Sequence, residues 1–141
     1  MMSITYNSEN ISFPDIDRNT VTAWIKQVAA KYGKKCGEIG YIFCDDERIL
    51  EVNRAFLQHD YYTDIITFDY CVGNIISGDI FISVDTVRSN ALQLGVDYDT
   101  ELYRVIIHGI LHLCGIDDKG PGEREIMEQC ENEALTMLAT L

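Results

Sequence analysis

Apolar residues recur every three or four positions in several stretches of the chain, and this spacing is typical of amphipathic helices. With capping residues at their starts and glycines at their ends, these stretches predict helices over residues 17–32, 45–56, 85–94, 99–114 and 123–138. We expect Asn19 or Thr20 to cap the first helix, Asp85 to cap the third, and Asp99 or Thr100 to start the fourth.

Runs of alternating or β-branched residues predict about four strands. They cover residues 3–6, 38–44, 63–70 and 78–84. Gly73 and Asn74 lie between the last two strands and are typical turn residues, so we expect these strands to form a hairpin. The order of elements indicates an α+β fold, with about five helices lying mostly on one face of a mixed sheet.

Length and composition indicate one domain over residues 1–141, since 141 residues with 47% hydrophobic positions suit a single core. No run of about 20 apolar residues is present, and the first ten residues contain neither a basic leader nor an apolar stretch. We therefore expect a cytoplasmic protein. The five cysteines contain no close pair, so we expect buried thiols in a reducing compartment.

The charge is strongly acidic: 23 Asp and Glu residues oppose 11 Lys and Arg, which leaves a net charge of −12. Proteins that bind phosphate chains by themselves normally present a basic surface. The charge therefore argues against tight, autonomous binding to nucleic acid.

One segment has the spacing of metal ligands. His108 and His112 are four residues apart, so on a helix they lie about 40° apart around the axis and can share one ion. Gly115 ends the helix and allows the chain to turn back, which offers Asp117 or Asp118 as a third ligand. Three protein ligands leave the fourth position of a tetrahedral zinc site open to water, as in catalytic sites.

A structural role is the alternative, because a helical histidine is more often a core or surface group than a ligand. The glycine and the aspartates beyond His112 favour the metal site, whose spacing is that of metzincin-type sites. Metallopeptidases of that type need Glu as the base at the position of Gly109, so this residue argues against a peptidase of that kind. Cys114 lies about 120° from His108 on a helical wheel, which indicates a core position.

The segment HGILHLCGIDD, residues 108–118, resembles the signature His-Gly-x-Leu-His-Leu-x-Gly-Tyr-Asp-His of the YbeY family, bacterial endoribonucleases that mature ribosomal RNA. The similarity extends over residues 38 to 131. It includes Asn53, Phe56, Asp60, residues 63–68, the Gly78-Asp79-Ile80 segment, Arg88, Ala91, Met127 and Glu128.

The resemblance implies one zinc ion per chain, held by His108, His112 and Asp118, where Asp118 replaces the third histidine of the family. A carboxylate makes the site less positive by one unit, so it should hold the metal at least as tightly but activate water less. The implied activity is cleavage of single-stranded RNA in 3′-end maturation of small-subunit ribosomal RNA and in ribosome quality control. The alternatives are a non-catalytic ribosome-assembly factor with a structural metal and a metallohydrolase of another substrate.

A second departure from the family is Leu57, where the family has an arginine thought to act on the phosphate. A leucine offers no charge or hydrogen bond to a phosphoryl group. His59 could replace the arginine as a cation or proton carrier, although a solvated loop histidine is an equal alternative. Arg54, one helical turn before, is a weaker catalytic candidate.

The implied partner, a ribosomal RNA precursor, must be reconciled with the charge of −12. Five of the 11 basic residues fall in one stretch: Arg18, Lys26, Lys31, Lys34 and Lys35. We therefore expect the first helix to face RNA, and we expect the ribosome or a basic ribosomal protein to recruit the chain.

Overall fold

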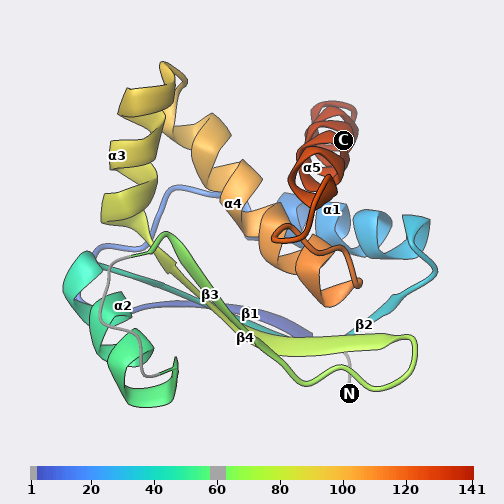
Figure 1. Cartoon of the computed structure of the whole chain (residues 1–141), viewed down its shortest axis with the longest axis horizontal. Helices are drawn as coiled ribbons and strands as arrows, with labels where there is room; N and C mark the ends of the chain where they lie inside the picture. Colours follow the sequence, from blue (N-terminus) through green and yellow to red (C-terminus); the bar gives the residue numbers. More distant parts are fainter. Residues whose placement is uncertain (1–2, 58–62) are drawn as a thin grey trace.

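A four-stranded sheet lies at the centre of the fold (Figure 1). The computed structural model describes residues 3–57 and 63–141. Its strands are β1 (Ser3–Ser8), β2 (Lys35–Cys44), β3 (Ile65–Asp69) and β4 (Ile75–Ser83), in the order β1-β2-β4-β3. The strands β1, β2 and β4 run parallel, and β3 pairs antiparallel with β4. The predicted mixed sheet and hairpin are confirmed.

Five α-helices complete the described part of the chain. They are α1 (Arg18–Lys31), α2 (Asp46–Val52), α3 (Val84–Leu94), α4 (Tyr98–Leu113) and α5 (Glu123–Ala139), and a π-helical turn, η1 (Asn53–Leu57), continues α2. The fold class is α+β in a single domain, as predicted. Within residues 3–57 and 63–141, no helix has the length and apolar character needed to cross a bilayer.

Helices α1, α4 and α5 lie on one side of the sheet, which we call the inner face, and α2 lies on the other, the outer face (Figure 1). The main core lies against the inner face and contains the fully buried Trp24 and Tyr41. Trp24 Nε1 donates a hydrogen bond to the Ala134 carbonyl oxygen (2.7 Å), and the Tyr41 hydroxyl donates to the carbonyl oxygen of Ile106 (2.8 Å). These bonds satisfy the polar atoms of both rings and join α1 to α5 and β2 to α4.

A smaller core lies against the outer face. Ile49 and Val52 of α2 bury themselves against Ile66 of β3, and Phe68 and Phe81 pack at the edge of this cluster. The ring pair Phe68 and Phe81 is edge-to-face at 6.0 Å. Thus α2 covers one end of the outer face and fixes the position of η1, which follows it.

Two helix caps lie before the predicted ones. Asp17 caps α1 by accepting hydrogen bonds from the backbone N–H groups of Asn19 and Thr20, the residues predicted to be caps. Ser83 caps α3, where Asp85 was predicted. Each segment contains several short polar side chains that could act as a cap. The residue that does so is the one whose side-chain oxygen accepts a hydrogen bond from a free backbone N–H group two or three residues later.

Helix α4 begins at Tyr98, one residue before the earlier of the two predicted starts. It packs closely on the hairpin, as a Cβ added at Gly109 would lie 3.0 Å from Ile80 Cδ1 and 3.3 Å from Ile65 Cδ1. Gly115 adopts φ +98°, a conformation that favours glycine, and lets the chain turn after the helix. Any side chain at position 109 would therefore crowd Ile80 and Ile65.

The five cysteines are free thiols. Cys36 and Cys44 are buried as predicted, whereas Cys71, Cys114 and Cys130 are half-buried, so the prediction was wrong for these three. Half-burial occurs because these three lie at the margins of the main core, against which they pack. Burial raises the pKa of Cys44 and that of Cys114 to about 12, so both remain neutral thiols at ordinary pH.

Candidate functional site

His108 of α4 lies between α5 and the turn that follows α4. Its Nδ1 is 2.7 Å from Oε2 of Glu131, and its Nε2 is 3.4 Å from Oδ2 of Asp118. The side chain retains 22% of its exposure. The two ring nitrogens therefore face carboxylates from two different parts of the chain.

Glu131 of α5 is held from two sides. Its Oε2 contacts His108, and its Oε1 accepts a hydrogen bond from Arg104 Nη1 at 2.9 Å. Arg104 Nη2 also donates to Asn132 Oδ1 at 2.8 Å. Because the Glu131 side chain is only 11% exposed, these partners replace the water that burial removes.

The electrostatic surroundings of His108 are acidic. Burial of the ring would lower its pKa, but the hydrogen bond and charge of Glu131 raise it, and the charges of Asp118 and Asp64 add to this, so the pKa is raised. Burial raises the pKa of Asp64, and the nearby His108 opposes this shift. Burial likewise raises the pKa of Glu101, which Arg104 opposes. Four carboxyl groups thus surround His108 and Arg104, and their negative charge favours a bound cation. They belong to Asp64, Glu101, Asp118 and Glu131.

His112 is half-buried and lies one turn beyond His108 on α4. Its charge has a small lowering effect on the pKa of Asp69, a pKa that is lowered chiefly by hydrogen bonds from Cys71. In the part of the chain that the structure describes, no three His, Cys, Asp or Glu side chains are grouped closely enough to hold a metal ion. The structure thus brings His108 and Asp118 together but does not group His112 with them.

The predicted catalytic candidates lie on or after the π-helical turn η1. Arg54 is exposed there, and Leu57 is 40% exposed. His59 lies outside the described residues, as does Asp60, one of the residues on which the family resemblance was based. The roles of Arg54 and His59 therefore remain predictions.

Sequence reasoning missed Glu131 and Arg104. A signal was present, because Glu131 lies on the same helical stripe as the buried Met127 and Ala134. A carboxylate in an apolar stripe needs a buried partner. The sequence could not name that partner, since His108 is 23 positions away.

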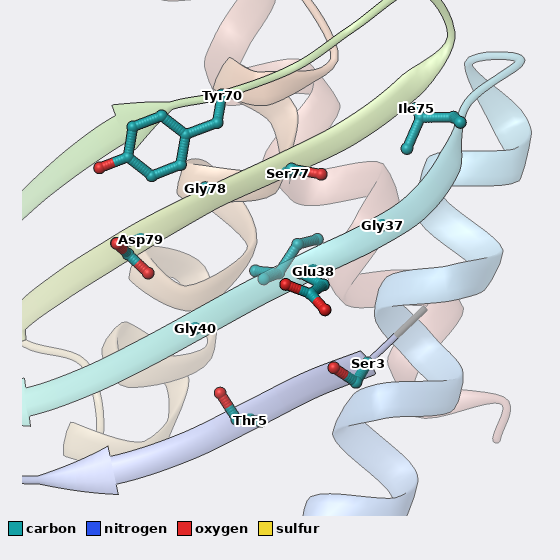
Figure 2. A pocket seen from close by; sticks show the side chains of 11 residues that line it. Ser3, Thr5, Gly37, Glu38, Gly40, Tyr70, Ile75, Ser77, Gly78 and Asp79 are labelled. Atoms are coloured by element: carbon teal, nitrogen blue, oxygen red, sulfur yellow. The ribbon is translucent and has the colours of Figure 1, made fainter. Parts of the chain in front are cut away.

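The outer face has a groove of its own, with a volume of about 640 Å³ (Figure 2). It lies over β1, β2 and β4, and side chains of Thr5, Glu38 and Asp79 rise from these strands around it. Gly40 keeps it open, because a Cβ there would lie 3.1 Å from Asp79 Oδ1. The groove and His108 lie on opposite faces of the sheet, so the groove is a separate surface.

A model of the family described as Endoribonuclease YbeY matches residues 3–139. A Bacteroides thetaiotaomicron protein of the name Endoribonuclease YbeY is 69% identical over 136 residues, covering 96% of this chain and 99% of that protein. A Porphyromonas gingivalis protein of the same name is 55% identical over 138 residues, covering 98% of this chain and 91% of that protein.

The fold is also similar to that in the solution structure of TM1509 from Thermotoga maritima. The TM-score is 0.68, at 23% sequence identity, over 98% of this chain and 93% of that one. This likeness concerns the fold alone. The matches to the family model and to the named relatives confirm the resemblance carried by residues 108–118, and the chain belongs to the YbeY family.

Proposed function

We propose that this protein is a zinc-dependent endoribonuclease that cleaves single-stranded RNA during ribosomal RNA processing. Family membership supports the endoribonuclease activity. One distance supports the proposed location of the site: Asp118 Oδ2 lies 3.4 Å from His108 Nε2. This contact brings together two of the three proposed ligands.

The donor chemistry fits zinc. Imidazole nitrogen and carboxylate oxygen are ordinary zinc ligands. Glu131 already occupies Nδ1 of His108, so Nε2 is the nitrogen that remains to bind metal, and metal-ligating histidines usually have such a carboxylate on the other nitrogen. His112 is the proposed third ligand, one turn from His108 on the same helix. When bound, the ion would supply a Lewis acid for a phosphoryl oxygen and an activated water.

Metal binding and proton transfer are assigned to different residues of this chain. His108, His112 and Asp118 would hold the ion, and Gly109, which has no side chain, supplies no base at its position. Leu57 provides no charge for the phosphate. We therefore propose His59 as the proton carrier and Arg54 as a weaker candidate. Substitution of His59 by Ala should lower cleavage without loss of metal.

The proposed substrate is the precursor of small-subunit ribosomal RNA, matured at its 3′ end in the cytoplasm, with a further role in ribosome quality control. The net charge of −12 means that the protein would reach RNA through a basic ribosomal protein or another basic partner. Glu38 and Asp79 of the outer-face groove offer carboxylates to such a partner. Among the basic residues of the first helix, Lys31 is paired with Glu133 at 2.7 Å, which leaves less positive charge there for RNA than the sequence indicated.

Metal analysis tests the proposed site. The purified protein should contain about one zinc per chain, and His108→Ala, His112→Ala and Asp118→Ala should each reduce zinc content and affinity. Asp117→Ala is the matched control, since Asp117 is the exposed neighbour of Asp118. Full zinc content in all three variants would contradict the ligand assignment.

A non-catalytic assembly factor with a structural metal is the second candidate. Leu57 favours it, because a leucine does not supply the arginine that the family resemblance predicts at this position. Zinc-loaded protein that stabilises ribosomal particles but does not cut RNA would support it. A metallohydrolase of another substrate would instead cut a phosphodiester or ester substrate and leave RNA intact.

A further inference from the structure

The contact between His108 and Glu131 joins two helices across the proposed metal site. The Nδ1 to Oε2 distance of 2.7 Å is that of a strong hydrogen bond with a charged acceptor. Arg104 lies one turn before His108 on α4 and reaches the other oxygen of Glu131 at 2.9 Å. The chain of contacts therefore runs from α4 to α5 and back to α4.

The donors and acceptors in this chain determine the state of the ring. A carboxylate only accepts hydrogen bonds, and a guanidinium only donates them. Glu131 Oε2 therefore requires a proton on Nδ1 of His108. In the neutral ring Nε2 then has the free lone pair, and it faces Asp118.

We propose that Glu131 is a positioning residue of the metal site, which holds His108 as the Nδ1–H tautomer with Nε2 directed toward the ion, and that Arg104 holds Glu131 in place. This inference rests on the proposed function where it concerns the ion. The orientation of the ring by Glu131 is independent of it.

Glu131→Gln is the most direct variant, because it preserves the size of the side chain. The amide has one acceptor oxygen, whereas the carboxylate has one oxygen for Arg104 and another for His108. Either Arg104 or His108 then faces the amide NH₂ group, and in the second case the ring must carry its proton on Nε2, where it blocks the metal. We expect zinc affinity, measured with a competing chelator, to fall about 10- to 100-fold. Glu131→Asp keeps both oxygens and should recover part of the affinity.

Glu128→Gln is the matched control, because Glu128 is an exposed glutamate one turn earlier on α5. It makes the same change of charge, so its zinc affinity should equal that of the unchanged protein. Equal losses in Glu128→Gln and Glu131→Gln would mean that overall charge is responsible, and this would overturn the proposal.

A second measurement needs no metal and no variant. The ¹⁵N chemical shifts of His108 in the metal-free protein, at a pH where the ring is neutral, should show the proton on Nδ1. A proton on Nε2 would overturn the positioning role, whether or not zinc binds. If zinc binds to neither the unchanged protein nor its variants while Nδ1 carries the proton, the proposed metal function fails and the positioning of the ring by Glu131 stands.

Discussion

Asp118 folds back across the turn after α4 and places Oδ2 3.4 Å from Nε2 of His108. Gly115, at φ +98°, makes this return possible three residues earlier. Asp118 stands where the family resemblance predicts a third histidine. A carboxylate there makes the proposed site less positive by one unit, so the charge of the site can be tested by substitution at this position.

Replacing Asp118 with His should make the site more positive by one unit and activate bound water more strongly. We expect Asp118→His to raise the cleavage rate by about tenfold, which corresponds to about 1.4 kcal/mol of barrier. Initial rates on a single-stranded RNA at saturating zinc measure this. The exposed Asp117→His is the control, and an equal gain in both variants would assign the effect to charge alone.

Leu57→Arg should supply the missing cation for the phosphate. Leu57 is 40% exposed at the end of η1, so an arginine fits without repacking the core. We expect cleavage to rise by at least about tenfold through stabilisation of the transition state. Ala55→Arg adds the same charge on an exposed position of the same turn and should leave the rate nearly unchanged. No gain in Leu57→Arg would show that this position does not reach the phosphate.

Gly109→Ala should destabilise the protein although alanine favours helices. The new Cβ would lie 3.0 Å from Ile80 Cδ1, and such overpacking typically costs about 1–3 kcal/mol. The higher helix propensity of alanine offsets at most about 1 kcal/mol of this cost. Urea unfolding should therefore show a net loss, and Ile80→Val in the same chain should reduce it. Additive effects of the two substitutions would contradict the close contact between helix and hairpin.

Cys44 should be unreactive in the folded protein. Burial raises its pKa from 9.0 to about 12, so the neutral thiol contributes stability that is fully present below pH 9 and is lost as the pH rises toward about 12. At pH 8 a thiol reagent, followed by mass spectrometry, should label Cys44 only after denaturation. The free energy of unfolding of Cys44→Ala should also fall less between pH 9 and 11 than that of the unchanged protein. Rapid labelling of native protein would contradict its burial.

The sequence predicted the elements that depend on local spacing. The apolar positions of α1, including Trp24 and Ile25, recur at helical intervals, and the Gly73-Asn74 turn indicates the hairpin, so these elements are confirmed. The predicted cap of α1, Asn19 or Thr20, was wrong, because Asp17 is an equally suitable capping residue and the local sequence does not rank the three.

Long-range partners could not be predicted in the same way. The parallel pairing of β1 with β2 and of β2 with β4 depends on how helices cross between strands. The contact of Glu131 with His108 depends on the packing of α5 against α4. The signature over residues 108–118 indicated the proposed metal ligands, but it contains no information on Glu131, the carboxylate that contacts the first of them.

The central claim is that His108 belongs to a metal site that cleaves RNA. The most direct measurement is cleavage of a ribosomal RNA fragment with a single-stranded 3′ extension, by the protein and by His108→Ala purified in parallel. The account predicts cleavage by the zinc-loaded protein, its loss on chelation, its recovery on return of zinc, and only background activity in the variant. Equal cleavage by both proteins, or cleavage that chelation does not affect, would contradict it.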